Sequence, residues 1–270
     1  MRSSARAQDQ FYTRPDVAAA CLSTFEEALR AAGIAPAWWI EPSAGTGAFL
    51  YLLPADRRTG LDIEPRGEGI ETADFLTWSP PEDMPRPIAA VGNPPFGRNA
   101  SKARRFLEHA SSFAALVGFI LPRTFEKETF QESLRPDLRL VTQISLNPAS
   151  FIFEGEDVSV PCVFQVWRPG QLPRPRRERS LSHPDFAFVG REEADFAFQR
   201  VGVRAGTVHR AFADRAAQSH HFVKDLSPKR DVAEVLERID WRDVKARTAG
   251  NPSIGKREII EAYIEARRGR

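Results

Sequence analysis

Residues 116–121 form an uninterrupted apolar run, Leu-Val-Gly-Phe-Ile-Leu, which ends at Pro122. A run of this length and character is typical of a β-strand that is buried on both faces. A strand is buried in that way when helices cover both sides of its sheet, as they do in parallel α/β proteins. We therefore predict that an α/β fold with a doubly wound, mostly parallel sheet is the framework of the chain.

Short apolar segments alternate with segments of helical periodicity through the first two thirds of the chain. Because ligands of doubly wound sheets bind at the carboxyl ends of the strands, motifs that follow these strands should meet in one crevice. Residues 147–157 are expected to be a loop. Helices are expected at residues 16–32, 102–110 and 126–134, with another beginning at 48–53, and further strands at 38–40, 59–63, 88–92, 140–146 and 158–167.

A Pro- and Arg-rich stretch at residues 168–179 cannot be a regular helix and is predicted to be a linker. It separates a catalytic domain at residues 1–167 from a small α+β region at residues 180–270. Strands are expected in that region at 186–189 and 196–201, and helices at 231–240 and 256–266.

The two sides of this boundary differ in charge. Residues 1–167 hold 16 Lys and Arg against 21 Asp and Glu, a net of −5, whereas residues 168–270 hold 22 against 15, a net of +7. A basic region beside an acidic body is expected where it meets a polyanion, because Lys and Arg displace counterions from phosphates. A solvated charged surface would have the same composition.

The composition argues against a membrane protein and against a disulfide-stabilised one. No apolar run approaches the roughly 20 residues that cross a bilayer, and the first residues are too polar for a signal peptide, so the cytoplasm is the expected location. Cys21 and Cys162 lie among apolar neighbours and are expected to be buried thiols. His220 and His221 have no companions at metal-ligand spacing, so no metal site is predicted.

Residues 41–47, Glu-Pro-Ser-Ala-Gly-Thr-Gly, follow a predicted strand and precede a predicted helix. Their glycines permit a tight turn and a close approach of a ligand to the backbone. A dinucleotide-binding turn would have a third glycine where this chain has Leu50. Asp62 ends the next strand about 20 residues later, the distance at which an acid binds a ribose. The spacing favours a nucleoside ligand.

Residues 93–96, Asn-Pro-Pro-Phe, follow the apolar segment 88–92. An amino group on an aromatic ring is a poor nucleophile, so a site that modifies it must accept its hydrogen bonds as the nitrogen becomes tetrahedral. The side-chain oxygen of Asn93 and the carbonyl of Pro94 can accept them, and neither Pro94 nor Pro95 has a competing amide hydrogen. Phe96 offers a face for a base. We interpret these four residues as catalytic, with a proline-rich turn as the alternative.

Five ordered segments resemble the motifs of the amino-methyltransferases that form N6-methyladenine in DNA. The resemblance extends from about residue 8 to residue 167 and is similar to the gamma arrangement, in which a target-recognition region lies on the C-terminal side. It implies a Rossmann-like class I methyltransferase fold, S-adenosylmethionine as cofactor, and double-stranded DNA as partner. The segments are residues 10–15, 41–47, 60–65, 73–76 and 92–96.

The same resemblance implies roles for single residues. The target base would be flipped out and stacked on an aromatic ring before the last strand, for which Phe153 is the first candidate and Phe151 the second; either ring could instead anchor the loop in the core. The implied cofactor contacts are Tyr12 and Thr13 to the methionine end, Glu41, Ala44, Gly45 and Gly47 to the amino-acid portion, Asp62 to the ribose, and Asp74 and Phe75 to the adenine.

Methyl transfer of this kind is a direct displacement that requires neither a metal nor a cysteine nucleophile. Arg123 is at the end of a predicted strand and is a candidate phosphate contact. Arg174, Arg176 and Arg177 are further candidates, although solubility of the linker would explain them equally well.

Other functions fit these residues. Methyltransferases that act on adenine in RNA, or on a protein glutamine, need the same acceptors for a planar nitrogen. A non-catalytic nucleic-acid-binding protein on the same fold is a rival of another class, against which the intact Asn93 and glycines argue. The C-terminal region is short for a nuclease and lacks a pair of acids with a lysine, which favours a solitary or separately partnered methyltransferase over a combined restriction enzyme.

Overall fold

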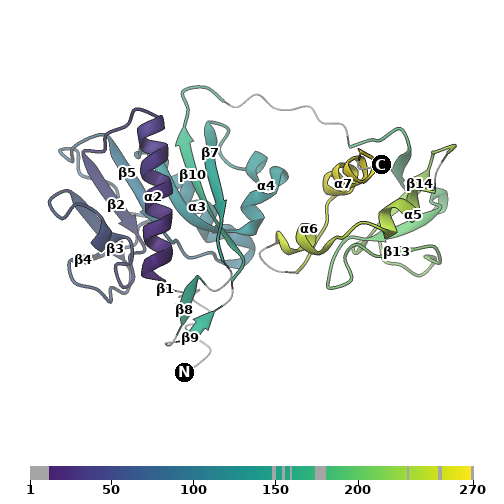
Figure 1. Ribbon diagram of the computed structural model, residues 1–270, viewed down its shortest axis with the longest axis horizontal. Helices are drawn as coiled ribbons and strands as arrows, with labels where there is room; N and C mark the ends of the chain where they lie inside the picture. Colours follow the sequence, from purple (N-terminus) through teal and green to yellow (C-terminus); the bar gives the residue numbers. More distant parts are fainter. Residues whose placement is uncertain are drawn as a thin grey trace. The chain divides into compact units, whose positions relative to one another are not determined.

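The computed structural model describes residues 12–147, 150–153, 156–158, 160–173, 181–229, 231–248 and 251–268. They belong to two compact units, Met1–Pro175 and Arg176–Arg270, each with its own hydrophobic core (Figure 1). Within these described ranges, no helix is long and apolar enough to cross a membrane.

The N-terminal unit is built on a seven-stranded sheet. The first five strands in the sheet order β4-β3-β2-β5-β6-β10-β7 are parallel, and β10 runs antiparallel to both of its neighbours. This is the Rossmann-like class I methyltransferase fold, so the predicted fold class is confirmed. The strands are β2 (Trp38–Pro42), β3 (Arg58–Asp62), β4 (Ile70–Thr72), β5 (Ile88–Gly92), β6 (Leu116–Pro122), β7 (Leu138–Ser145) and β10 (Cys162–Pro169).

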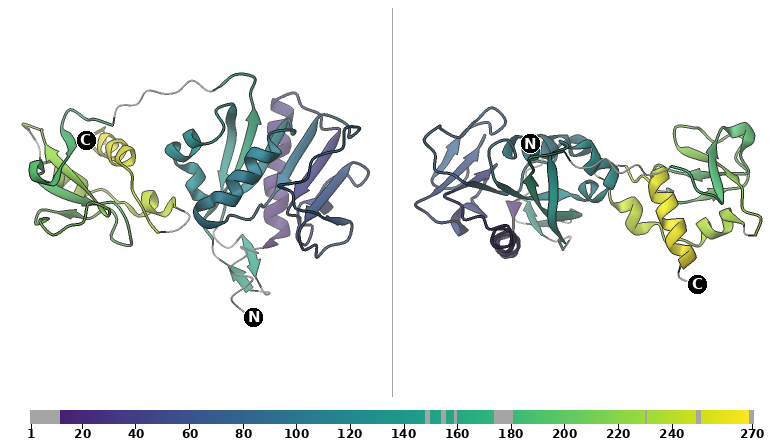
Figure 2. Two further views of the ribbon diagram at one scale, coloured as in Figure 1. Left: turned by 180° about the vertical axis from the view of Figure 1, so that it is seen from behind. Right: turned by 90° about the horizontal axis from the view of Figure 1, so that it is seen from above.

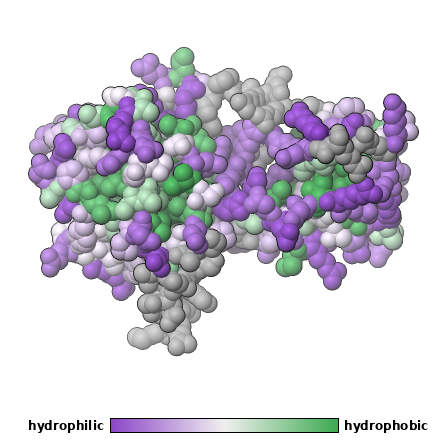
Figure 3. Space-filling view, viewed as in Figure 1, coloured by the Kyte–Doolittle hydropathy of each residue, from purple (hydrophilic) through white to green (hydrophobic). Residues whose placement is uncertain are grey.

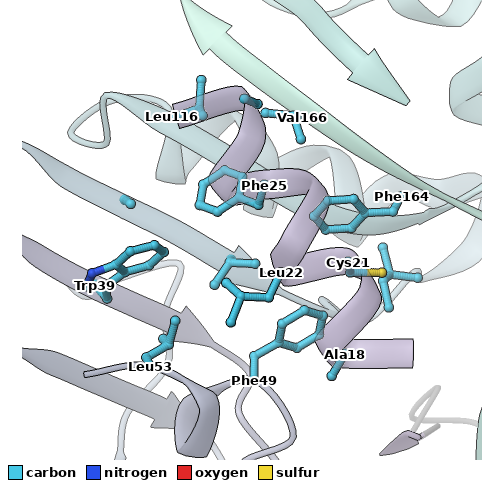
Figure 4. Packing of buried hydrophobic residues seen from close by; sticks show 14 of the residues in the cluster. Ala18, Cys21, Leu22, Phe25, Trp39, Phe49, Leu53, Leu116, Phe164 and Val166 are labelled. Atoms are coloured by element: carbon cyan, nitrogen blue, oxygen red, sulfur yellow. The ribbon is translucent and has the colours of Figure 1, made fainter. Parts of the chain in front are cut away.

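Helix α2 (Pro15–Ala31) covers one face of this sheet, and α3 (Ser101–Ala110) covers the other (Figure 2). The apolar stripe of α2 packs on β5, β6 and β10, and Phe25 lies at the centre of that contact (Figure 4). All seven residues of β6 are buried, as expected for a strand covered on both sides. Phe25 reaches the sheet because β6 has Gly118 there; a Cβ on Gly118 would lie 2.6 Å from the Phe25 ring.

A second, small sheet joins the beginning of the N-terminal unit to a segment near its end in sequence. Its strands are β1 (Tyr12–Thr13), β8 (Phe151–Phe153) and β9 (Glu156–Val158), in the order β1-β8-β9. Tyr12 pairs with Ile152 and Thr13 pairs with Phe151. The prediction of a loop over residues 147–157 is therefore wrong in part, because β8 pairs both with the distant β1 and with β9, which follows it directly.

The predicted helix at residues 48–53 is also wrong. Only a single 3₁₀ turn, η1 (Leu50–Leu52), is present. Leu53 has an extended backbone, with φ −84° and ψ 156°, as is favoured before a proline, and Pro54 follows it. The chain therefore enters β3 without a helix. The helix predicted at 126–134 is divided into a 3₁₀ turn, η3 (Arg123–Glu126), and α4 (Glu128–Ser133).

The C-terminal unit has a four-stranded antiparallel sheet in the order β11-β14-β12-β13. Helices α5 (Val232–Glu237) and α7 (Lys256–Arg268) pack against it around Phe198, Trp241 and Tyr263, and a third helix is α6 (Arg242–Ala246). Polar side chains cover much of the face of this unit that is visible in Figure 3. The strands are β11 (Phe186–Val189), β12 (Phe196–Gln199), β13 (Val208–His209) and β14 (His220–Asp225).

Candidate active site

The carboxyl ends of β2, β3 and β5 meet at one edge of the sheet, because these strands are parallel neighbours. The glycine turn follows β2, Asp62 ends β3, and Asn93 follows β5. A cavity of about 230 Å³ opens among them. The sequence-predicted residues that line it are Tyr12, Thr13, Glu41, Ala44, Gly45, Asp62, Asn93 and Pro95.

The carboxylate of Asp62 fixes the glycine turn. It accepts hydrogen bonds from the backbone N–H of Gly45, at 2.7 Å, and of Glu64, at 2.8 Å. Gly45 has a φ of +53°, and a Cβ on it would lie 3.1 Å from the Tyr12 ring. Glycine at this position therefore allows both the left-handed turn and the close approach of Tyr12, which forms one wall of the cavity.

Glu41 is 2% exposed and holds the far side of the same turn. Its two carboxyl oxygens accept hydrogen bonds from Phe49 N, at 3.3 Å, and from Leu50 N, at 2.5 Å. Burial raises the pKa of this carboxyl well above its ordinary value, and the two backbone N–H groups oppose the shift. Both of its oxygens accept hydrogen bonds from the protein itself. The contact between Glu41 and the cofactor stays a prediction.

The segment 93–96 is fixed at both ends by contacts that the sequence did not reveal. The Ser43 hydroxyl lies 3.2 Å from the carbonyl oxygen of Asn93 and 2.6 Å from that of Pro42. At the other end, the Phe96 carbonyl accepts hydrogen bonds from Lys102 N and Ala103 N, in the first turn of α3, at 3.1 and 3.2 Å. The glycine turn and the helix therefore position Asn93 together.

The remaining members of this segment differ in position. Pro94 is buried and Pro95 lines the cavity. Phe96 lines neither this cavity nor the adjoining one, and its partly buried ring packs against the core beneath α2. Its role as a face for a base therefore stays a prediction.

A second cavity, of about 250 Å³, adjoins the first and shares five lining residues with it. Asp74 and Phe75, the predicted adenine contacts, line this cavity. Phe75 is 2% exposed and packs against Phe106 and His109, with ring centroids 5.1 and 5.0 Å away, so its ring has little surface left for a ligand. The shared residues are Ser43, Asp62, Ile63, Pro95 and Lys102.

Lys102 was not predicted as a site residue, although it lines both cavities. Arg105, one turn further along α3, lines the second cavity. The signal that could have identified them is their position, since they begin the helix directly behind the Asn-Pro-Pro-Phe segment. They bring positive charge to a cavity whose other charged members, such as Asp62, are acidic.

Several predicted site residues lie away from the cavities. Gly47 has a φ of +82° and shapes the turn without lining a cavity. Phe151 is fully buried in the core beneath α2, so it has no ring face to offer a base, and the core-anchoring alternative applies to it. The side chain of Phe153 lies outside the described residues.

Arg123, a predicted phosphate contact, lines neither cavity. Arg123 is 22% exposed, and its Nε donates a 2.6 Å hydrogen bond to Glu126. Its guanidinium, expected to meet a phosphate, is thus engaged in an ion pair. Arg174, Arg176 and Arg177 lie outside the described residues, and their role stays a prediction.

Neither cysteine lines these cavities. Cys21 and Cys162 are buried and free, and burial raises the pKa of Cys21 to about 12 and that of Cys162 above its ordinary range. Within the described ranges, no group of three or more His, Cys, Asp or Glu side chains could hold a metal ion.

No protein-family model and no curated protein sequence matches this chain. Three methyltransferases among the solved structures are similar to it. A candidate RNA methyltransferase from Pyrococcus horikoshii has 18% identity over 60% of this chain and 88% of its own, with a TM-score of 0.45. The 23S rRNA methyltransferase ErmE has 18% identity over 57% and 70%, with a TM-score of 0.39. A magnesium protoporphyrin IX methyltransferase from Synechocystis PCC 6803, with bound SAM, has 10% identity over 56% and 79%, with a TM-score of 0.38.

At this level of similarity the three structures identify neither the substrate nor the cofactor of this chain. The fold assignment rests on the order and direction of its own strands.

Proposed function

We propose that this chain is an S-adenosylmethionine-dependent methyltransferase that acts on the exocyclic N6 of adenine in DNA. The observation that carries the proposal is that Asn93 lines the same cavity as the glycine turn and Asp62. A nucleoside cofactor on the turn and an amino group at Asn93 would then share one site. The resemblance of five ordered segments to adenine methyltransferases supports adenine as the target.

The two adjoining cavities are lined by polar groups that could bind S-adenosylmethionine. The carboxylate of Asp62 can accept hydrogen bonds from ribose hydroxyls in addition to those from Gly45 and Glu64. Asp74, in the second cavity, offers an acceptor to an adenine ring, and the buried Phe75 lies in the wall behind it. When bound, this cofactor supplies an electrophilic methyl group on a sulfonium centre.

Asn93 supplies the acceptor that the incoming amino group needs. An amide oxygen takes a hydrogen bond from the amino N–H and stabilises the positive charge that develops on that nitrogen. Ser43 and the first turn of α3 hold the segment, so Asn93 need not reorganise during the reaction. Alignment of the reacting groups supplies much of the acceleration in such a displacement.

Substitution of Asn93 tests the proposal directly. Asn93→Ala should abolish methyl transfer while leaving cofactor affinity within a few-fold, because the acceptor is removed and the turn is not. Transfer is measured with a tritium-labelled cofactor and duplex DNA, and cofactor affinity by calorimetry. Asn251→Ala, at an exposed position in the C-terminal unit, is the matched control and should keep full activity. Unchanged turnover in Asn93→Ala would place the chemistry elsewhere.

The same assay separates the rival functions. Duplex DNA, total RNA and protein are offered in parallel, and label in DNA is the expected result. Label only in RNA or only in protein would contradict the DNA assignment while retaining methyl transfer. Binding of cofactor and nucleic acid with no label in any substrate would indicate the non-catalytic alternative.

A further inference from the structure

Two groups of arginines in the C-terminal unit differ in their partners. Those of the first group each form an ion pair with a carboxylate, at exposed or partly exposed positions. Such pairs neutralise their own charge and contribute little to a field outside the protein. The pairs are Arg210 with Asp231, Arg238 with Glu234, Arg242 with Asp240, Arg247 with Asp243, and Arg267 with Asp185.

The second group is Arg200, Arg204 and Arg215. In the part of the chain that the structure describes, none of the three forms an ion pair with a carboxylate. Arg200 donates instead to the backbone carbonyl of Gln218, at 3.2 Å. The Nε atoms of Arg200 and Arg215 are buried without an acceptor among the described residues. These three side chains therefore carry positive charge that the protein itself does not neutralise.

The fold brings the three arginines to one end of the sheet. Arg200 follows β12, and Arg204 lies in the turn between β12 and β13. Gln199 at the end of β12 pairs with His220 at the start of β14, and Arg200 N donates to Ser219 O at 2.9 Å. The segment that contains Arg215 leads into β14 at this same end.

The pKa of His209 reflects the positive electrostatic potential at this end of the sheet. Burial lowers the pKa of its imidazole, and the positive charges of Arg215 and Arg204 lower it further. Asp214, the acid beside Arg215, forms no ion pair with it among the described residues. The three arginines therefore form a cationic surface on the loops at this end of the sheet.

We propose that Arg200, Arg204 and Arg215 form the surface on which this chain binds the sugar-phosphate backbone of its nucleic-acid substrate, an inference that rests on the proposed function. The planar guanidinium donors of arginine match phosphate oxygens, and a polyanion relieves the mutual repulsion of three cations held together. An anionic membrane fits less well, because Val203 is the one large exposed apolar side chain in the described turn beside them.

The test compares two triple variants with the same change in charge. Arg200→Gln, Arg204→Gln and Arg215→Gln are combined in the cluster variant, and Arg238→Gln, Arg242→Gln and Arg247→Gln in the control. Binding of the full chain to a fluorescent duplex DNA is measured over a range of NaCl concentrations. The cluster variant should bind at least tenfold more weakly, and its slope of log affinity against log salt should fall by about 2 to 3, since each phosphate contact contributes about 0.9. The control should stay within about twofold of wild type, because its arginines are already neutralised.

Two further measurements keep the result interpretable. The single exposed substitution Arg204→Gln should lower the slope by about 1, which tests the surface even if the triple variant folds poorly. Cofactor affinity should be unchanged in every variant. Equal weakening in both triple variants, or none in the cluster variant, would overturn the inference. So would a loss of binding to phosphatidylserine vesicles in the cluster variant with DNA binding unaffected.

Failure of the inference differs from failure of the proposed function. If the wild type methylates DNA and the cluster variant binds DNA normally, the proposed function holds and this surface is wrong. If the cluster variant loses DNA binding and the wild type methylates no nucleic acid, the surface holds and the proposed function is wrong.

Discussion

The Ser43 hydroxyl connects two parts of the candidate site, the glycine turn and the segment 93–96. Ser43 lies in the glycine turn, has a φ of +56°, and its Oγ is within hydrogen-bond distance of the Asn93 carbonyl. A serine in this left-handed conformation is strained relative to glycine. The strain is accepted at a position where the hydroxyl connects the turn to the segment that holds Asn93.

Replacement of Ser43 should therefore affect turnover more than cofactor binding. Ser43→Ala removes the hydroxyl and should lower kcat several-fold, the equivalent of about 1 kcal/mol for one hydrogen bond, with little change in cofactor affinity. Ser43→Gly removes the same hydroxyl and also relieves the backbone strain, so it should be more stable than Ser43→Ala by about 1 kcal/mol with a similar kcat. Steady-state kinetics and urea denaturation measure both. Wild-type turnover in the two variants would show that the contact does not position Asn93.

At the residue scale, the sequence identified those site residues whose side-chain chemistry is distinctive. Asp62 and Asn93 line the predicted crevice because each ends or follows a parallel strand. Ser43 and Lys102 were missed because their importance depends on position alone. Phe96 and Phe151 were placed at the site because aromatic rings suit a base; Phe151 belongs to the core, and the partly buried Phe96 packs against it. Aromatic character does not distinguish stacking on a ligand from packing in the protein.

At the scale of the elements, the contact between α2 and β6 depends on the absence of a side chain. Phe25 and Phe164 both approach Gly118, where a Cβ would lie 2.6 and 2.8 Å from their rings. Alanine is ordinarily better than glycine in a strand, because glycine loses more conformational entropy. Here the added methyl group would force two buried rings apart.

Gly118→Ala should therefore lower the free energy of unfolding by about 1 to 3 kcal/mol, the usual cost of overpacking a core. Urea denaturation, followed by fluorescence, would show a lower midpoint with the same slope. Gly190→Ala is the control, since nothing lies within 4 Å of a Cβ there and its φ is −68°. A neutral Gly118→Ala would mean that helix and strand can separate at no cost.

The elements that the sequence predicted correctly are those with strong local signals. Continuous apolar runs predicted β5 and β6, and a helical stripe predicted α2. At residues 48–53 a following proline ends the helical pattern, and at 147–157 the strands pair in part with a segment distant in sequence. Strand β8 pairs with β9, which follows it directly, and with β1, which is distant in sequence; a local pattern cannot reveal the second pairing.

At the scale of the whole molecule, each unit has its own core. The reactivity of the two thiols measures the opening of one of these cores. Both Cys21 and Cys162 belong to the core of the N-terminal unit. Burial disfavours the thiolate, so the pKa of Cys21 rises from an ordinary value of 9.0 to about 12. The thiolate is the reactive form, so reactivity requires that this core opens.

The native protein should consequently react slowly with an aromatic disulfide reagent between pH 7 and pH 9. In denaturant both thiols should react at once. Their rate of reaction should rise as the pH approaches their ordinary pKa, because a larger fraction of each is then thiolate. The native rate should follow the unfolding rate of the N-terminal unit, measured by fluorescence under the same conditions. Rapid labelling of either thiol in native buffer would contradict the packing around α2.

The small sheet that seats Tyr12 has a consequence for the order in which the protein is made. Tyr12 forms a wall of the first cavity, yet its strand partner Ile152 leaves the ribosome about 140 residues later. A nascent chain that has emerged as far as Asn93 already contains the glycine turn and Asp62, but nothing yet holds Tyr12 over them. The pocket is therefore completed late in synthesis, after α3 has emerged to position Asn93 and β8 has emerged to pair with the strand of Tyr12.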